Sequence, residues 1–218
     1  TDCIYLTSTA VSDDLFGSAV TLPSKIGTTA DLAAVDFDLD GDLDILRLIK
    51  SSRLQLFFNP AGSDVIGSVV DDETLPIQSA EAIDIGDIDG DGDNDVIFGN
   101  ADADDEIYLN RNRAINSNYG WHDDILASSA AVISADINDD GYMDLFVGNY
   151  PPNDEAENFN MGGDGTDLLY FGTENGLSTT PGWHSNSTFT STSATWFDYD
   201  TDGDLDLYVG ISGPDVIY

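Results

Sequence analysis

Short apolar segments and aspartate-rich turns alternate along the whole chain. Four segments share the pattern D-x-[D/N]-x-D-G-x-x-D between two apolar runs: AVDFDLDGDLDIL (34–46), IGDIDGDGDNDVIF (85–98), SADINDDGYMDLFV (134–147) and WFDYDTDGDLDLYV (196–209). Runs of four to eight β-prone residues bounded by turn residues are typical of strands. No segment shows the longer period of an amphipathic helix. The pattern therefore predicts an all-β chain.

A second apolar motif repeats in step with the first. It reads CIYL (3–6), LQLFF (54–58), EIYL (106–109), DLLYF (167–171) and DVIY (215–218). The aspartate turns start at Asp36, Asp87, Asp136 and Asp198, so their spacings are 51, 49 and 62 residues. Units of about 50 residues with about four strands each are typical of propeller blades. We expect a β-propeller of four-stranded antiparallel blades, with about four blades present.

The repeat divides the chain into units of approximately 1–30 (partial), 31–82, 83–131, 132–193 and 194–218 (partial). The apolar IYL-type strand occurs at both ends, which favours a single segment of a larger propeller. A closed four-bladed ring or a short solenoid is the alternative. The third unit is the longest, and its extra residues fall within 149–166. Glu155, Glu157, Asp164 and the glycines could make another metal or ligand site there, or the insertion is simply solvated.

The charge narrows the range of partners. The chain has 42 acidic and 6 basic residues, a formal charge of −36. Nucleic acids and anionic membranes are bound through Lys and Arg, so we expect neither as a partner. No stretch approaches the roughly 20 apolar residues of a membrane helix, so we expect no membrane insertion. Cys3 is the only cysteine, which excludes an intrachain disulfide and a thiolate metal cluster.

The spacing inside each turn suits a hard cation. Ca²⁺ takes six to eight oxygen ligands, and positions 1, 3 and 5 would place three short oxygen donors inside a tight curve. Glycine at position 6 permits φ > 0, a carbonyl at position 7 can point inward, and aspartate at position 9 closes the site. The side-chain ligands predicted for about four Ca²⁺ ions are Asp36, Asp38, Asp40 and Asp44; Asp87, Asp89, Asp91 and Asp95; Asp136, Asn138, Asp140 and Asp144; and Asp198, Asp200, Asp202 and Asp206. The predicted carbonyl ligands are those of Asp42, Asp93, Tyr142 and Asp204, and the glycines are Gly41, Gly92, Gly141 and Gly203.

An EF-hand begins with the same pattern but needs a glutamate at position 12. The residues at position 12 are Arg47, Phe98, Val147 and Val209, and none of them can ligate calcium in that way. The EF-hand interpretation therefore fails. A set of solvated acidic turns without metal is the remaining alternative, and four turns in register argue against it.

These turns resemble the calcium loops of FG-GAP/VCBS repeats, which occur in the integrin alpha-subunit propeller and in many secreted bacterial proteins. The resemblance implies a β-propeller, usually seven-bladed, with each Ca²⁺ between the first two strands of a blade. Only fragments of the family's Phe-Gly signature survive, such as Phe98-Gly99 and Phe171-Gly172. This departure favours the broader bacterial or archaeal type over integrins.

The tripeptide GWH occurs twice and is a candidate ligand-binding feature. Trp121 and His122, and again Trp183 and His184, lie at the same distance before an aspartate turn. They are either packing residues at one blade edge or an aromatic platform for a sugar ring with a histidine hydrogen bond. Two histidines and no local Ser–His–Asp grouping leave few nucleophiles, so we expect no enzyme activity and no catalytic residues.

These features predict an extracellular or cell-surface module that uses structural Ca²⁺ and recognises a protein or glycan ligand. Calcium near the millimolar range outside cells would fill sites of roughly 10⁻⁴–10⁻³ M affinity. One alternative is a structural subunit of an extracellular filament or surface layer, whose partners are copies of itself. Another is an accessory domain of a secreted hydrolase.

Overall fold

A computed structural model describes residues 3–7, 16–21, 27–50, 53–59, 69–72, 75, 77, 79–112, 114–116, 120–125, 127–151, 164–188 and 190–218. The extra residues of the third unit at 152–163, with Glu155 and Glu157, lie outside these ranges. The regular structure of the described residues consists of strands. No helix among them is long and apolar enough to cross a bilayer.

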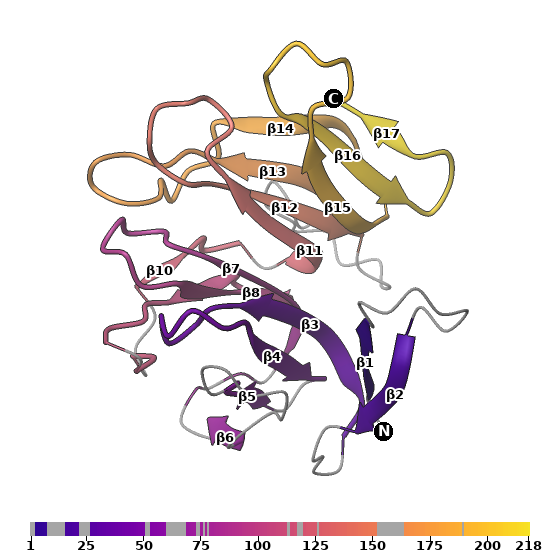
Figure 1. The fold of residues 1–218 in the computed structure, drawn as a ribbon. Coiled ribbons are helices and arrows are strands. Elements are labelled where there is room, and N and C mark those ends of the chain that lie inside the picture. The colour runs from indigo at the N-terminus through magenta and orange to yellow at the C-terminus, as the bar shows by residue number, and fades with distance from the viewer. Residues whose placement is uncertain are drawn as a thin grey trace.

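The strands form consecutive antiparallel sheets that follow the repeat of the sequence (Figure 1). A hairpin, β1 (Cys3–Thr7) with β2 (Phe16–Thr21), comes first. The first blade is β3 (Thr29–Val35), β4 (Asp44–Ile49), β5 (Arg53–Phe57) and β6 (Val69–Asp72). The second blade is β7 (Ala80–Gly86), β8 (Asp95–Ala103), β9 (Glu106–Tyr108) and β10 (Trp121–His122). The third blade is β11 (Ala127–Ala135), β12 (Asp144–Tyr150), β13 (Thr166–Tyr170) and β14 (Trp183–Thr188). The fourth contains β15 (Ser191–Phe197), β16 (Asp206–Ile211) and β17 (Val216–Ile217).

The first strands of successive blades lie next to one another. Asp31 on β3 accepts a hydrogen bond from the Ile83 N–H on β7 at 3.1 Å. Asp84 on β7 in turn accepts one from the Ser134 N–H on β11 at 2.6 Å and one from its hydroxyl at 2.7 Å. A short β8–β11 pairing at Ala101 and Ala103 also joins the second and third blades into one sheet. Side chains on the innermost strands therefore connect each blade to the next.

The core consists of apolar layers between neighbouring blades. Val96 and Phe98 on β8 pack in the layer shared with the first blade, whereas Ile97 packs in the layer shared with the third. On β13, Leu168 packs in the layer shared with the second blade, and Leu169 packs in the layer shared with the fourth. Successive side chains of a strand point to opposite faces, and both faces of a blade are covered. This is why the strands after the aspartate turns read as continuous apolar runs rather than as alternating ones.

A buried aspartate–serine contact also links adjacent blades, and it occurs twice. Asp105 accepts hydrogen bonds from the Asn100 N–H at 2.8 Å and, across the blade boundary, from the Ser129 hydroxyl at 2.8 Å. Asp167 likewise accepts from the Asn149 N–H at 2.9 Å and from the Ser191 hydroxyl at 2.8 Å. Burial raises the pKa of Asp105 well above its ordinary value, and the neighbouring Asp123 carboxylate adds to the effect. Each contact lies beside the start of a third strand and fixes the chain there.

Candidate metal centres

Four loops connect the first and second strands of the four blades, and they share one backbone conformation. Position 6 is glycine with φ of 99° (Gly41), 94° (Gly92), 90° (Gly141) and 102° (Gly203). A Cβ at any of them would meet nothing within 4 Å, so the requirement for glycine comes from the left-handed backbone and not from crowding. The sequence prediction for position 6 is confirmed.

Position 4 is also left-handed, which the sequence motif does not reveal. There φ is 56° (Leu39), 73° (Gly90), 56° (Asp139) and 64° (Thr201). For leucine and threonine this conformation is costly, on the order of 1–3 kcal/mol. Leu39 is also 52% exposed, so burial of its side chain does not offset the cost of this backbone conformation. Two left-handed residues in each loop curl the backbone so that positions 1, 3 and 5 face the same interior.

The aspartate at position 1 organises each loop through both of its carboxylate oxygens. Oδ1 accepts a hydrogen bond from the N–H of position 5, and Oδ2 accepts one from the N–H of position 6. In the second loop these are Asp91 N–H and Gly92 N–H to Asp87, both at 3.0 Å. The same pair of bonds closes the other three loops at Asp36, Asp136 and Asp198. Carboxylate oxygens carry further lone pairs, so these bonds leave each one able to ligate a cation.

The aspartate at position 9 is the first residue of the second strand in every blade. Its Oδ2 accepts the N–H of position 2, as from Ile88 to Asp95 at 3.0 Å. In the first three blades its Oδ1 accepts a 2.8 Å bond from a residue just past the third strand: Asn59 to Asp44, Asn110 to Asp95 and Gly172 to Asp144. Burial raises the pKa of Asp95 to about 6, against the lowering effect of these N–H donors. Position 9 therefore ties the loop to the second and third strands.

The carboxylates converge closely enough to share one ion. Ligand oxygens of three acids lie within 4.8 Å of one another in the first loop (Asp36, Asp38, Asp40), the second (Asp87, Asp89, Asp95) and the fourth (Asp198, Asp200, Asp206). Ca²⁺–oxygen distances of 2.3–2.6 Å place opposite ligands about 5 Å apart, so the spacing fits that ion. The third loop has Asn138 at position 3, whose Oδ1 accepts the Asp140 N–H at 3.0 Å. All donors are oxygens, which suits a hard cation; the carbonyl role of position 7 stays a prediction.

Arg111 adds a cation to the second loop that the sequence motif did not indicate. It lies two residues past the end of the EIYL segment, and its guanidinium forms ion pairs with Asp89, at 2.5 Å, and with Asp91. The neighbouring Asn112 N–H donates to the Asp93 carboxylate at 2.7 Å. Positions 3 and 5 of this loop are thus engaged by a positive side chain from the same blade.

The two GWH segments lie at equivalent places in the second and third blades. Trp121 is buried, donates its indole N–H to the Ser178 carbonyl at 3.1 Å and lies edge to face with Tyr170. Trp183 is only partly buried and lies edge to face with Tyr218. The two tryptophans therefore differ in accessibility, although they make the same type of contact with the next blade.

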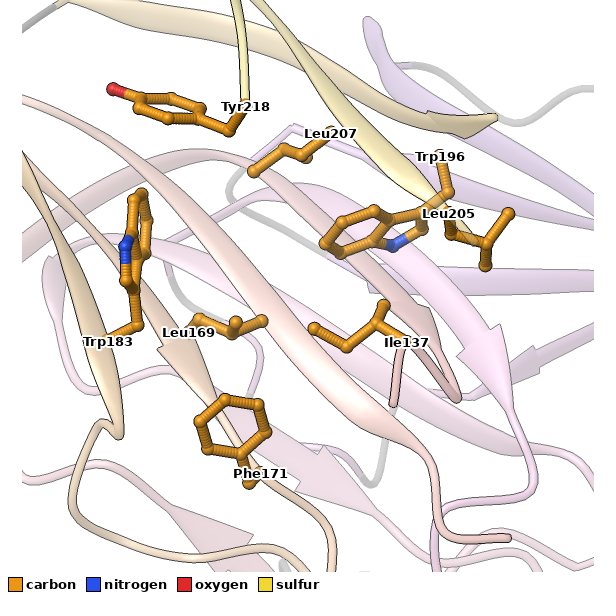
Figure 2. Close-up of a pocket in the computed structure, with 8 residues that line it drawn as sticks. All are labelled: Ile137, Leu169, Phe171, Trp183, Trp196, Leu205, Leu207 and Tyr218. Atoms are coloured by element: carbon orange, nitrogen blue, oxygen red, sulfur yellow. The ribbon is translucent and has the colours of Figure 1, made fainter. Parts of the chain in front are cut away.

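An apolar cavity of about 220 Å³ lies between the third and fourth blades. Its lining consists of Ile137, Leu169, Phe171, Trp183, Trp196, Leu205, Leu207 and Tyr218, as Figure 2 shows. The indole N–H of Trp196 is buried and has no hydrogen-bond partner within the described part of the chain. The cavity therefore presents aromatic faces, and it includes Trp183 of the second GWH segment.

Known proteins with this geometry are β-propellers. The solved structure of BBS1N in complex with ARL6DN, soaked with mercury, matches over 99% of this chain at 15% identity with a TM-score of 0.56. The lead-soaked structure of the same complex matches at 14% identity with a TM-score of 0.55. This chain spans 57% of the length of that BBS1N chain. The V. cholerae biofilm matrix protein Bap1 matches over 82% of this chain and 34% of its own length, at 19% identity and a TM-score of 0.37. The sheet order and the likeness to BBS1N show that the all-β fold is that of a partial β-propeller.

Residues 87–147 match the sequence model of the FG-GAP-like repeat. This range begins at the first aspartate of the second loop and ends in β12, so it includes the second and third aspartate loops. The resemblance inferred from the loop motifs is confirmed, and the chain carries an FG-GAP-like repeat. Among curated proteins, no sequence matches the chain.

Proposed function

We propose that the chain is an extracellular Ca²⁺-binding β-propeller module that recognises a protein or glycan ligand, with the metal in a structural role. The observation that carries the proposal is the convergence of acidic oxygens in the loops. Three carboxylates meet within 4.8 Å in three of the four loops, each at the junction of a blade's first two strands. Such oxygen-only sets match the ligand preference of Ca²⁺.

The structural role follows from where the ligands sit. Without a cation, several carboxylates at one bend repel one another, and the chain as a whole carries a charge of −36. A bound ion removes that repulsion. It also joins the loop to β8 through Asp95, and to the segment just past β9 through the hydrogen bond from Asn110 to Asp95. We expect binding to stabilise the folded state because the unfolded chain has no preformed site.

The cavity between the third and fourth blades supports the recognition role. Trp183 and Trp196 offer aromatic faces, which stack on the apolar face of a sugar ring or on an apolar side chain. BBS1N, which shares the fold, was solved in complex with ARL6DN, so a domain of this fold can bind a protein partner. We assign the chain no catalytic activity of its own.

Calcium titration tests the proposal. Isothermal titration calorimetry of chelator-treated protein should report about four Ca²⁺ per chain, and thermal unfolding should shift upward as Ca²⁺ is added. Equivalent concentrations of Mg²⁺ should stabilise less, because Mg²⁺ demands a smaller octahedral site. Heats and melting temperatures that do not respond to Ca²⁺ would exclude the metal role. Binding of the chain to a glycan array, and the effect of Trp183→Ala on that binding, then test the recognition role.

A further inference from the structure

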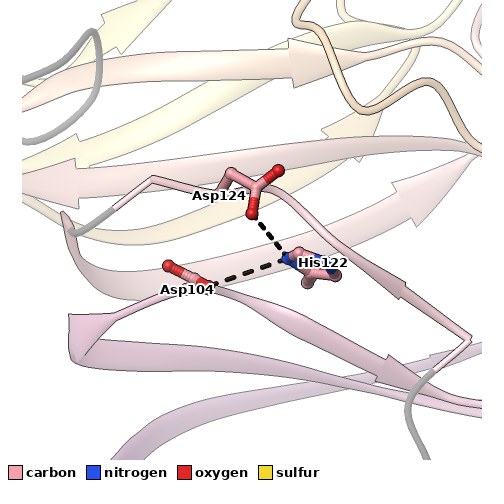
Figure 3. A group of neighbouring side chains, drawn as sticks. All are labelled: Asp104, His122 and Asp124. Carbon is pink, nitrogen blue, oxygen red and sulfur yellow. Dashed lines mark ion pairs between the residues drawn. The ribbon is translucent and has the colours of Figure 1, made fainter.

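A histidine and two carboxylates meet on the second blade, away from the four loops. The Nδ1 atom of His122 lies 3.1 Å from Oδ1 of Asp124 and 3.7 Å from Oδ2 of Asp104 (Figure 3). His122 is on β10, Asp104 lies in the turn between β8 and β9, and Asp124 follows β10. We propose that these three side chains form a binding site for a borderline divalent cation of the Zn²⁺ type, separate from the calcium loops.

The donor spacing is right for such an ion. Zn–N and Zn–O bonds are about 2.0–2.2 Å, so two donors in a tetrahedral site lie about 3.4 Å apart. The two measured separations, 3.1 and 3.7 Å, fall on either side of that value. The three ligand atoms also lie within 4.8 Å of one another. An ion can therefore be placed between the imidazole and the two carboxylates with small side-chain adjustments.

Each of the three ligands is adjacent in sequence to a residue that is fixed in the core. Asp104 precedes Asp105, whose carboxylate is fully buried and bonded to Asn100 and Ser129. His122 follows the buried Trp121. Asp124 follows Asp123, which accepts the Asp105 N–H at 3.1 Å and the Tyr170 hydroxyl at 3.0 Å. The backbone on which the site rests is thus positioned before any ion arrives, which lowers the cost of binding.

The third blade shows that the fold does not require these carboxylates. Asp105 and Asp167 occupy equivalent places, since each accepts the N–H of an asparagine at the end of the second strand. By the same register Thr166 stands where Asp104 does, and Asn186 stands where Asp124 does. His184 is retained, but its Nδ1 lies 3.1 Å from the Ser185 carbonyl oxygen. The second blade therefore carries two acids around its histidine that its neighbour lacks.

The donor set selects the class of ion. Imidazole nitrogen suits Zn²⁺ and related transition metals, whereas Ca²⁺ prefers oxygen alone, as in the loops. The side chains of His122, Asp104 and Asp124 are 34%, 37% and 78% exposed, so an ion held by three protein ligands keeps a position open to water. Glu106, opposite His122 in the β9–β10 pair, adds a further negative charge nearby. The site is an open one rather than a closed structural centre.

The test uses Zn²⁺ titration at millimolar Ca²⁺, which keeps the loops occupied. We expect one Zn²⁺ site per chain, weakened on the order of 100-fold in His122→Ala and in the Asp104→Asn/Asp124→Asn double variant. His184→Ala is the matched control and should bind Zn²⁺ as the unaltered chain does. The chain has 2 histidines, so imidazole NMR resolves them: one equivalent of Zn²⁺ should shift the His122 signals and leave those of His184 unchanged.

Calcium binding of each variant shows whether it is folded, and it separates this proposal from the function of the loops. Zn²⁺ affinity that is unchanged in His122→Ala, or a His122 resonance unmoved by one equivalent of Zn²⁺, would overturn the site. Failure to bind Zn²⁺ at all under calcium saturation would do the same. In those cases the three side chains contact one another without binding an ion.

Discussion

The ring of Trp121 meets the ring of Tyr170 edge to face, with centroids 5.1 Å apart and planes at 78°, across the boundary between the second and third blades. Trp183 and Tyr218 repeat this arrangement one blade later, at 5.1 Å and 76°. Each pair joins a tryptophan on a fourth strand to the tyrosine of an IYL-type segment in the next blade. The two sequence motifs, GWH and IYL, thus meet as one contact between blades.

Replacing Trp121 should destabilise the fold more than replacing Trp183. Trp121→Ala removes a buried indole, its edge-to-face contact and its bond to Ser178, and we expect a loss of about 3–5 kcal/mol in the free energy of unfolding. Trp183→Ala should cost clearly less, because Trp183 is only partly buried and lines a cavity. Denaturant unfolding at saturating Ca²⁺ measures both. Equal losses would show that the two tryptophans have the same structural role.

Asp95 should be essential for the second calcium site, whereas Asp93 should be replaceable. Asp95→Asn removes a predicted ligand charge at position 9, and calorimetry should then report one Ca²⁺ fewer per chain. Asp93→Asn makes the same change in charge two residues earlier, where only the backbone carbonyl is expected to ligate. Its stoichiometry should stay that of the unaltered chain. If both variants lose a site, or neither does, the ligand assignment of this loop is wrong.

Arg111 should weaken calcium binding at the second loop. Its guanidinium contacts Asp89 and Asp91, and an arriving ion must displace it from both. An exposed ion pair contributes up to about 1 kcal/mol, so Arg111→Gln should raise the affinity of this loop by roughly fivefold at low salt. Arg111→Lys keeps the charge and should change the affinity less. Calorimetry of each Arg111 variant in the Asp95→Asn background, which should lack the second site, identifies the site that responds. An unchanged or lower Ca²⁺ affinity in Arg111→Gln would contradict a competition between Arg111 and the ion.

The apolar strands, the four turns and the repeat could be predicted from sequence because each depends on residues close together in the chain. The position 9 aspartates were predicted to close the turns, and Asp44, Asp95, Asp144 and Asp206 are the first residues of the second strands. Glycine at position 6 was informative since only that residue takes φ near 90° at low cost. Local chemistry therefore determined most of the fold and the outline of the loops.

Contacts that depend on how strands pair could not be read from the sequence. The left-handed backbone of Leu39 and Thr201 carries no signal, because neither residue type favours that conformation. Arg111 reaches Asp89 only because β9 returns beside β8. Asp104 and His122, far apart in the chain, become neighbours through the β9–β10 register. The Arg111–Asp89 and Asp104–His122 contacts both depend on the packing of strands that are separated in sequence.

Asp167 should make stability depend on pH in a way that its amide variant does not. The carboxylate is fully buried; its Oδ1 accepts the Asn149 N–H and the Ser191 hydroxyl, while its Oδ2 has no hydrogen-bond partner within the described residues. Burial raises the pKa of Asp167 from 3.8 to about 6, and the two hydrogen bonds oppose the rise only in part. The folded state therefore holds this proton more tightly than the unfolded chain does.

A raised folded-state pKa means that the stabilising effect of protonation is fully present below the unfolded value of 3.8 and is lost as the pH rises through about 6. At pH 7 the ionised group costs the fold at most about 3 kcal/mol relative to its protonated form. Asp167→Asn keeps one acceptor oxygen and carries no charge, so it should unfold at higher denaturant than the unaltered chain at pH 7, with the difference vanishing near pH 4. Asp105 and Asp123 titrate equally in both proteins, and so cancel in that difference. Glu174→Gln, which replaces an exposed carboxylate by an amide, is the control. The assigned pKa would be refuted if the stability difference between Asp167→Asn and the unaltered chain stayed constant from pH 4 to pH 7.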